Sequence, residues 1–392
     1  MSLIILCVLL LAVDLSHGQL SIFTTNTYNN NTEAPDPQIS VGSTARQARK
    51  RTLSDSCLTD EDTQGTCMTR FNCMLQGGSV KGYCGTYGVC CETNLQCGAT
   101  SKLKRIIIRN PVTLERTCNY RIEAYSSSVC QLLIEFERFE LKQPTLDVGQ
   151  QKLDCTDYFT VDKFTLCGDN TQQHLYIPFR MGGNEVVQLT FELPDRWSGT
   201  KWRLIVTQLE CPVAKKRSSS ILSFGNQNNL QDLRTIFSTH HSDWDLLAPI
   251  GCDQFYRDSR GTIKSFNYQT SGNTYYMAET NYAICIKPVM GATMIEYTTR
   301  DFSMSSRNPI NLGFDENCHS TVFSDKVRKD YLMIPQSLLA SNMNMQPTYY
   351  CGNLDGNTQV TILGGLPYVM YFYSDELTDT TETGFSIDYA VK

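Results

Sequence analysis

The sequence predicts an all-β protein, with two disulfide-bonded antiparallel β-sandwich domains preceded by a small cysteine knot. Two observations carry this prediction. Apolar and polar residues alternate with a period of two in several segments of residues 97–211 and 251–392, which is the pattern of a strand with one buried face. Cysteine is also frequent, with 17 in 392 residues, and in a secreted chain this frequency indicates disulfide bonds.

Length and charge limit the number of domains and the class of partner. A chain of 392 residues is expected to form two or three domains of roughly 100–150 residues each. Its formal net charge of -6 provides no general attraction for the nucleic-acid backbone, which is bound by dense Lys and Arg. We therefore expect no nucleic-acid partner.

Residues 1–18 have the features of a signal peptide that is removed on secretion. Residues 3–13 are an apolar run too short for a helix that spans a bilayer, which needs about 20 residues. Ser16 and Gly18 suit the -3 and -1 positions of a cleavage site. Removal takes away Cys7 and leaves sixteen cysteines, an even number that fits complete pairing. We expect a secreted, extracellular protein, in which no later segment is apolar enough to span a membrane.

Residues 19–56 are expected to form a disordered leader, because they have too few apolar residues to offset the entropy of ordering. Asn30 begins the sequon Asn-Asn-Thr, a candidate N-glycosylation site. The leader also contains a basic run at 46–51. A furin-like protease could cut this run after Arg49 or Arg51, and a solvated run of charges is the alternative interpretation.

Residues 57–91 are expected to form a disulfide knot, because they are too few to fold by burial alone. Their six cysteines are Cys57, Cys67, Cys73, Cys84, Cys90 and Cys91. Six cysteines allow fifteen pairings, so the connectivity is open at this point. Three bonds would stabilise the segment by roughly 2–4 kcal/mol each.

The first strand-rich block shows both a regular alternation and one interruption. Apolar side chains occupy every second position in residues 186–193 and again in 132–136. Residues 139–141 continue with the opposite parity, which predicts a β-bulge near Arg138. Residues 202–209 have the composition of a closing strand.

Residues 212–250 interrupt the strand pattern and are expected to form a linker or a long insertion. Within them, 230–237 could form a short helix. The basic run 215–217 could be cut by a protease or bind an acidic glycan, and a solvated linker is the favoured alternative. His240 and His241 suggest a metal site, but adjacent residues on a strand point to opposite faces and no further ligand lies at a suitable spacing, so exposed linker residues are favoured.

The second strand-rich block has the clearest strand signals. Residues 385–391 alternate up to the end of the chain, which predicts a core-facing strand whose truncation unfolds the domain. Tyr275 and Tyr276, with two neighbouring asparagines, are a candidate recognition surface, and buried sheet aromatics are the favoured alternative.

A catalytic function is not expected. A serine protease would need a Ser in a GDSGG-like turn, a His in an AAHC-like segment and an Asp that orients the His. None of these strings occurs, and none of the histidines after the signal segment lies in the context of a general base. We therefore expect a protein that is not an enzyme.

Four strings in the second block, beside its cysteines, carry a family resemblance. They are DYLMIP at 330–335, YCG at 350–352, FYSD at 372–375 and GF at 384–385. With them, residues 251–392 resemble a CUB domain of the arthropod extracellular type, and residues 97–211 resemble a second, more diverged copy. The resemblance implies jelly-roll-like sandwiches that serve in the recognition of proteins or glycans.

In CUB domains the first two cysteines bond to each other, and so do the next two. The resemblance therefore implies the pairs Cys252–Cys285 and Cys318–Cys351 in the second block and Cys97–Cys118 and Cys155–Cys167 in the first. Cys130 and Cys211 are additional to the family pattern and are paired with each other by exclusion.

Many CUB domains bind calcium through one Glu and two Asp, an oxygen-only set that suits a hard cation. Asp330 and Asp375 match the two Asp, but a methionine lies near the place of the Glu, so the resemblance implies at most a weakened calcium site. In the first block Asp157 and Asp195 are the counterparts, and Lys142 occupies the Glu position, where a cation opposes calcium. We expect no other cofactor.

The cysteine spacing of the knot, which ends in the pair Cys90 and Cys91, resembles that of an arthropod clip domain, where the adjacent cysteines bond to two different partners. Clip domains are docking or regulatory modules, and a stapled spacer is the alternative. Together the resemblances imply a non-enzymatic extracellular protein that binds a protein or glycan through CUB domains. The alternatives are a non-catalytic regulator or cofactor of an extracellular serine protease cascade and a structural matrix or cuticle component.

Overall fold

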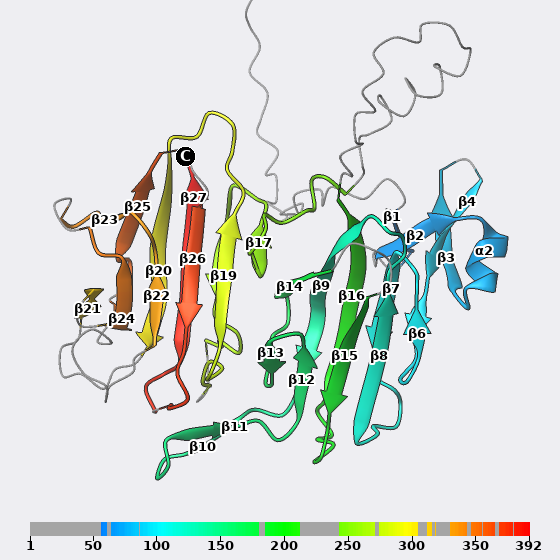
Figure 1. The fold of residues 1–392 in the computed structure, drawn as a ribbon, viewed down its shortest axis with the longest axis horizontal. Helices are drawn as coiled ribbons and strands as arrows, with labels where there is room; N and C mark the ends of the chain where they lie inside the picture. Colours follow the sequence, from blue (N-terminus) through cyan, green and yellow to red (C-terminus); the bar gives the residue numbers. More distant parts are fainter. Residues whose placement is uncertain are drawn as a thin grey trace, which may run out of the picture. The chain divides into compact units, whose positions relative to one another are not determined.

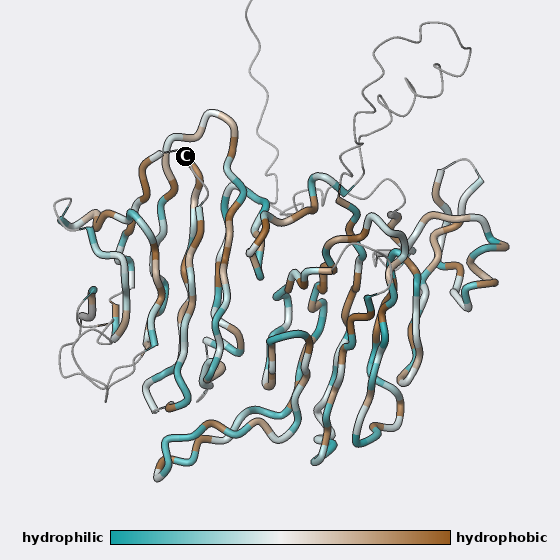
Figure 2. Tube along the Cα trace, viewed as in Figure 1, coloured by the Kyte–Doolittle hydropathy of each residue, from teal (hydrophilic) through white to brown (hydrophobic). Residues whose placement is uncertain are grey.

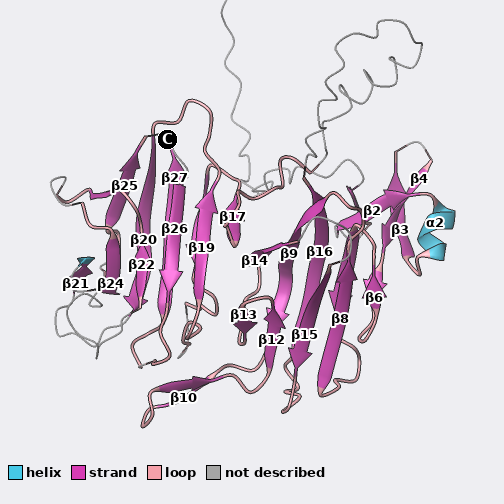
Figure 3. Ribbon diagram, in the orientation of Figure 1, coloured by secondary structure: helices cyan, strands magenta, loops and turns pink. Residues whose placement is uncertain are grey.

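A computed structural model describes residues 56–392 except for gaps at 61–63, 86, 180–184, 212–242, 271–273, 305–311, 316–317, 319–329, 343–345, 355, 365–367 and 379. Strands dominate these residues, as Figure 3 shows, and α2 (Arg70–Leu75) is the α-helix in the described part of the chain. The predicted all-β fold is therefore confirmed.

The first described unit is a four-stranded antiparallel sheet that carries α2 (Figure 1). Its strands are β1 (Ser56–Leu58), β2 (Gln64–Met68), β3 (Ser79–Cys84) and β4 (Gly88–Glu92), in the order β1-β2-β4-β3. Thr69 caps α2, because its side chain accepts a hydrogen bond from the backbone N–H of Asn72. Few side chains are buried here, so disulfide bonds connect the strands and the helix.

The first sandwich consists of two five-stranded sheets, ordered β13-β12-β15-β8-β6 and β14-β9-β16-β7-β5. Their bounds are β5 Asn94–Leu95, β6 Thr100–Ser101, β7 Arg105–Arg109, β8 Thr117–Glu123, β9 Val129–Glu140, β12 Tyr158–Val161, β13 Phe164–Leu166, β14 His174–Pro178, β15 Val186–Glu192 and β16 Lys201–Glu210. A separate hairpin joins β10 (Thr145–Asp147) to β11 (Lys152–Asp154).

The core of this sandwich follows the alternation in the sequence. Every second residue of β15 is buried, and the rings of Phe191 on β15 and Trp202 on β16 stack with their centroids 4.0 Å apart. On β9 the register against β16 moves from Arg138 to Phe136, so a bulge at Glu137 separates the two parities. The bulge predicted near Arg138 is confirmed, and it lets Phe136 and Phe139 both face the core.

The second sandwich begins at β17 and ends with the chain. Its strands are β17 Gln254–Tyr256, β18 Arg260–Lys264, β19 Asn281–Ile286, β20 Met294–Met304, β21 Leu312–Phe314, β22 Tyr331–Met333, β23 Ser337–Leu339, β24 Tyr349–Asn353, β25 Gln359–Leu363, β26 Tyr368–Tyr373 and β27 Gly384–Val391. β17-β19-β26-β22-β24 run as one layer, and β27, β20, β25 and β23 belong to the other, with β18 paired to β27. Among the described strands, backbone pairing connects the two layers where the end of β20 meets β24.

Side chains from both layers meet in the core of the second sandwich. Tyr282, Phe372, Leu332 and Tyr350 form one inward row across β19, β26, β22 and β24. Phe372 contacts Phe385 of β27 with ring centroids 6.1 Å apart. Since alternate residues of β27 from Phe385 to Val391 are buried, the predicted core-facing C-terminal strand is confirmed. Figure 2 shows apolar and hydrophilic residues interspersed along the strands.

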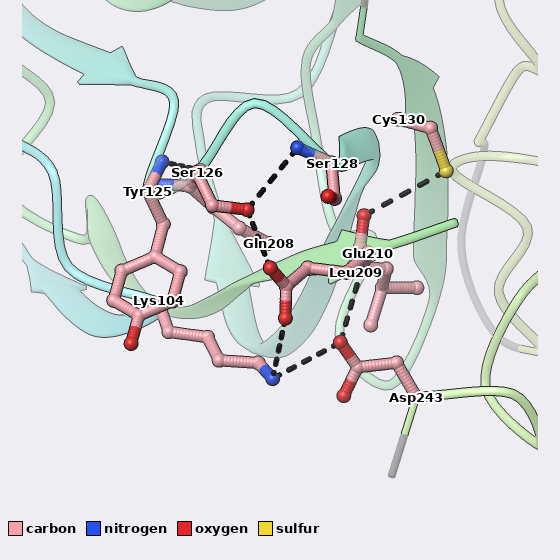
Figure 4. A network of polar contacts seen from close by, with 9 residues as sticks. All are labelled: Lys104, Tyr125, Ser126, Ser128, Cys130, Gln208, Leu209, Glu210 and Asp243. Atoms are coloured by element: carbon pink, nitrogen blue, oxygen red, sulfur yellow. Dashed lines mark hydrogen bonds and ion pairs between the residues drawn. The ribbon is translucent and has the colours of Figure 1, made fainter. Parts of the chain in front are cut away.

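The connection after the first sandwich returns to it at Asp243, which a polar network holds in place (Figure 4). Asp243 is buried, accepts a hydrogen bond from the backbone N–H of Glu210 and lies 3.1 Å from the ammonium of Lys104. The Lys104 ammonium also contacts Glu210 at 3.5 Å. Leu246 and Ala248 then pack against Leu133 and Tyr176, so this end of the connection belongs to the folded structure.

Hydrogen bonds join the two sandwiches, which belong to one compact unit. The Nε2 atom of His174 on β14 accepts the backbone N–H of Phe255 on β17 at 2.9 Å. The buried Asn267 donates its backbone N–H to Asn170 Oδ1 at 2.7 Å, and its own side-chain oxygen accepts the N–H of Asp169 at 2.9 Å. His174, Asn170 and Asn267 are therefore paired with groups of the other sandwich.

Candidate functional site

Tyrosines cover the outward side of three neighbouring strands in the second sandwich. The inward row described above fixes the parity of β22, β24 and β26, because side chains alternate between the two faces of a sheet. The outward positions therefore include Tyr331, Met333, Tyr349, Tyr371 and Tyr373, and we call this set the outer tyrosine face. Tyr371 is 37% exposed, and the other four are half-buried.

Three of the four tyrosine rings of the outer tyrosine face pack against one another. Tyr331 and Tyr373 stand opposite each other on β22 and β26, with ring centroids 5.1 Å apart and planes at 17°. Tyr349 meets Tyr331 edge to face at 5.1 Å. Burial raises the pKa of Tyr331, and its neighbours Tyr349 and Tyr373 add to the rise, so its hydroxyl stays protonated at neutral pH. The arrangement is a partly exposed aromatic surface in which neighbouring rings contact one another.

Sequence reasoning missed this face because its members come from three separate segments. Only the registers of β22 against β24 and β26 bring them together. The strand 368–373 is also apolar or aromatic at every position, so its sequence has no alternation that would identify the outward residues.

The tyrosines considered first in the sequence have a different role. Tyr276 is buried, and its hydroxyl donates a hydrogen bond of 2.5 Å to Asp330 Oδ2. Tyr275 accepts a hydrogen bond at its backbone carbonyl from Asn267. Tyr276 is thus a buried aromatic, which confirms for this residue the favoured interpretation over that of an exposed recognition surface.

Asp330 and Asp375 lie next to each other at one edge of the second sandwich. The backbone N–H of Asp375 donates to Asp330 Oδ1 at 2.6 Å, and Asp375 Oδ1 accepts the N–H of Leu377 at 2.7 Å. Both residues are buried, and Met304 is also buried in the core. The two carboxylates therefore fix the backbone of the loop after β26.

The corresponding pair in the first sandwich lies beside a lysine. Asp157 is buried and accepts the backbone N–H groups of Asp195 and Trp197 at 2.9 and 3.0 Å. The ammonium of Lys142 forms an ion pair with Asp195. This contact raises the pKa of Lys142, and the charges of Asp157 and Asp154 contribute further. A cation of the protein itself thus lies among these carboxylates.

Among the residues that the structure describes, no three His, Cys, Asp or Glu side chains come together in a way that could hold a metal ion. Several candidate residues and one candidate helix predicted from the sequence lie outside the residues that the structure describes. They are Asn30, Arg49, Arg51, His240, His241, His319 and the segment 230–237.

Sixteen cysteines form eight disulfide bonds in the structure. They are Cys57–Cys90, Cys67–Cys84, Cys73–Cys91, Cys97–Cys118, Cys130–Cys211, Cys155–Cys167, Cys252–Cys285 and Cys318–Cys351. The adjacent Cys90 and Cys91 have different partners, and no pair connects the two sandwiches among the eight described bonds.

His174 is the histidine that the structure describes, and its surroundings keep it neutral. Burial lowers its pKa to about 4, a shift that Glu135 opposes and Arg257 reinforces. Its Nε2 is engaged by the Phe255 N–H, as described above. These contacts assign it to the junction of the sandwiches.

A family comparison identifies the second sandwich. Residues 249–392 match the family described as Animal CUB domain, whose members are non-catalytic binding modules of extracellular proteins. Together with the eight disulfide bonds, the match points to an extracellular protein. In the part of the chain that the structure describes, no helix has the length and apolar character that crossing a membrane requires. No curated protein matches the chain.

Solved structures with some likeness include CUB1-EGF-CUB2 fragments of MASP-1. The rat fragment is 13% identical, covers 75% of this chain and 99% of its own, and has a TM-score of 0.23. The human MASP-1/3 fragment is 12% identical, covers 74% and 100%, and scores 0.22. The extracellular region of zebrafish Gpr126/Adgrg6 is 11% identical, covers 75% and 36%, and scores 0.23. Scores this low show no common arrangement of the whole chains.

Proposed function

We propose that this chain, whose residues 249–392 match the animal CUB domain, is a non-enzymatic extracellular protein that binds another protein through its outer tyrosine face. The observation that carries the proposal is the set of four tyrosines on one outward surface of three adjacent strands. Tyrosine is enriched in protein interfaces because it offers a large apolar area and a hydroxyl with few rotatable bonds. Rings that already pack together lose little freedom on binding.

The geometry favours a protein over a glycan as the partner. A sugar binds to aromatic residues by stacking on an open ring face. Tyr331 and Tyr373 turn ring faces toward each other, and Tyr349 packs against Tyr331. These three rings are therefore engaged with one another, and together with the exposed Tyr371 they form a mixed polar and apolar surface, which suits a protein interface.

The test begins with capture on the full mature protein. Extracellular fluid of the source organism is passed over the wild-type protein and over a double variant, Tyr371→Ser with Tyr373→Ser. Proteins retained by the wild type and lost with the variant are identified by mass spectrometry and produced in pure form. A matched control is Tyr125→Ser, which removes an exposed tyrosine of the first sandwich. Equal capture on all three proteins would contradict the proposal. Binding to a glycan array that depends on Tyr371 and Tyr373 would also contradict it.

A second candidate function is the regulation of an extracellular serine protease cascade. It is supported by the knot, in which the adjacent Cys90 and Cys91 bond to Cys57 and Cys73. The expected result is that the full protein changes the activation rate of a protease zymogen from the same fluid. An unchanged rate at saturating protein would rule out this function.

Secretion, glycosylation and processing belong to the same proposal. Intact-mass analysis of the secreted protein should show a chain that has lost residues 1–18 and carries a glycan on Asn30. If the basic run is cut, the chain should instead begin directly after Arg49 or Arg51 and lack Asn30 with the rest of the leader. A chain that begins at Met1 would contradict the signal peptide.

A further inference from the structure

The two faces of the knot's sheet are secured in different ways. On β4 the side chains of Cys90 and Cys91 point to opposite faces, since they are adjacent on a strand. Cys90 bonds to Cys57 on one face. Cys67 stands opposite Cys90 on the neighbouring strand, so the bond Cys67–Cys84 lies on the same face. Cys91 bonds to Cys73 of α2 on the other face, so a single disulfide holds the helix to the sheet.

The helix turns its apolar residues toward solvent. Phe71, Met74 and Leu75 are at positions i, i+3 and i+4, which form one stripe of a helix. They are 69%, 67% and 69% exposed, and Cys73 is the buried residue of α2. An amphipathic helix ordinarily packs such a stripe against the core. Here the disulfide attaches the helix through its other side, and the stripe is available for contacts with another molecule.

Two further apolar side chains lie on the same face of the sheet. Tyr83 stands directly opposite Val89, which packs against Cys73 under the helix, and Tyr83 is 82% exposed. Leu58 is two residues from Ser56, which pairs with Thr66, and Thr66 pairs with Cys91. Leu58 therefore lies on the same face of the sheet as Cys91, and it is 57% exposed. We call Leu58, Phe71, Met74, Leu75 and Tyr83 the helix-side patch.

The size of this patch is that of an interaction surface. A Phe or Tyr side chain has roughly 150–250 Å² to bury, so Phe71 and Tyr83 alone leave on the order of 250 Å² exposed. Three aliphatic side chains add to this area. Large exposed apolar patches on monomeric proteins mark binding sites, and the stripe of Phe71, Met74 and Leu75 is the contiguous part of this one.

From these observations we infer that the helix-side patch binds a polypeptide segment of a partner protein that carries apolar side chains and a carboxylate. Arg70, the first residue of α2, is exposed beside the stripe, and the first turn of α2 has no acidic residue. An arginine in this setting favours a carboxylate, which it can bind through two parallel hydrogen bonds. A membrane is a poorer match, because membrane-surface helices combine an apolar face with several Lys and Arg.

The test uses the full chain and random linear peptides displayed on phage, so it needs no knowledge of the natural partner. Selected peptides should combine apolar residues with Asp or Glu. Their affinity should fall at least about tenfold for a double variant, Phe71→Ser with Leu75→Ser. It should be unchanged for Met290→Ser, which alters an exposed apolar residue of the second sandwich, and for Tyr371→Ser with Tyr373→Ser. The last variant separates this inference from the outer tyrosine face.

A second variant keeps the test decisive. Arg70→Glu should weaken the binding of peptides with Asp or Glu. It should strengthen the binding of peptides in which these residues are replaced by Lys. Disulfide mapping and the circular dichroism of each variant verify that the knot is intact. The inference is overturned if no peptide is enriched, or if peptides bind the double variant as well as the wild type. It is also overturned if the patch instead binds phosphatidylserine vesicles or joins two copies of the chain in light scattering.

Discussion

The ring of Tyr331 stacks on the ring of Tyr373 across two neighbouring strands, with centroids 5.1 Å apart and planes at 17°. Aromatic pairs of this kind contribute about 0.5–1.5 kcal/mol beyond their buried area. Tyr373→Ser should therefore lower the free energy of unfolding by an amount in this range, plus a small contribution from lost area. Urea unfolding measures it, and a loss above 4 kcal/mol would mean that Tyr373 belongs to the core rather than to an outward surface.

The hydroxyl of Tyr276 should stabilise the second sandwich through its bond to the buried Asp330. Hydrogen bonds to charged groups contribute about 1.5–3 kcal/mol, so Tyr276→Phe should lower the free energy of unfolding by this amount. The matched control is Tyr297→Phe. Tyr297 is equally buried, and its hydroxyl has no hydrogen-bond partner in the described structure, so its removal should cost nothing or stabilise the protein. Equal losses for the two variants would contradict the account.

Lys142 should keep calcium away from the first sandwich, because its ammonium lies among Asp195, Asp157 and Asp154. Lys142→Glu replaces this cation with a fourth carboxylate, and oxygen ligands of this kind suit calcium. Millimolar calcium should therefore raise the unfolding temperature of the variant more than that of the wild type, as measured by calorimetry. A variant that responds to calcium no more than the wild type does would contradict this role of Lys142.

The junction of the sandwiches should lose stability in acid because of His174. Its pKa is about 4 in the folded protein and about 6.5 in an unfolded chain. As the pH falls from 6.5 toward 4, the unfolded state takes up a proton that the folded state excludes, so the unfolded state gains stability relative to the folded one. At about 1.4 kcal/mol per pKa unit the loss approaches 3 kcal/mol near pH 4 and is absent above pH 6.5.

The comparison with His174→Gln isolates this contribution from that of the carboxylates. A glutamine can still accept the Phe255 N–H but does not titrate. The difference in unfolding free energy between wild type and variant should change with pH between 6.5 and 4 and be constant above that range. A constant difference over the whole range would show that His174 is protonated as easily in the folded protein as in the unfolded chain.

The last strand should be essential for the second sandwich. Deleting residues 385–392 removes Phe385, Ile387 and Tyr389 from the core, leaves β18 without its pairing strand and takes one of its neighbours from β20. Each large core side chain contributes several kcal/mol, about 2–5 on truncation to Ala, and a domain has only 5–15 kcal/mol of net stability. The shortened protein should show no cooperative unfolding of this domain, and a normal transition would contradict the assignment of β27 to the core.

The architecture could be predicted where one local pattern decides the structure. Alternation identified β15 and β27, and the change of parity on β9 identified the bulge beside Arg138. In each of these segments a buried face and a solvated face differ in composition, so the sequence itself specifies which side chains are inward.

The two surfaces could not be predicted, because each depends on contacts between distant segments. Tyr331, Tyr349 and Tyr373 become neighbours only through the register of three strands. The spacing of Phe71, Met74 and Leu75 would by itself indicate a buried stripe. It is the bond between Cys73 and Cys91 that turns the stripe outward, and the pairing of six cysteines cannot be deduced from their spacing alone.

The affinity for the captured partner tests the central claim most directly. Surface plasmon resonance with the purified partner would compare the wild type, the double variant Tyr371→Ser with Tyr373→Ser, and the control Tyr125→Ser. Loss of two interface tyrosines should raise the Kd at least about tenfold, because aromatic residues at the centre of an interface contribute most of its binding energy. The control should bind as the wild type does. A double variant that folds normally and binds with the wild-type Kd would contradict the assignment of the outer tyrosine face.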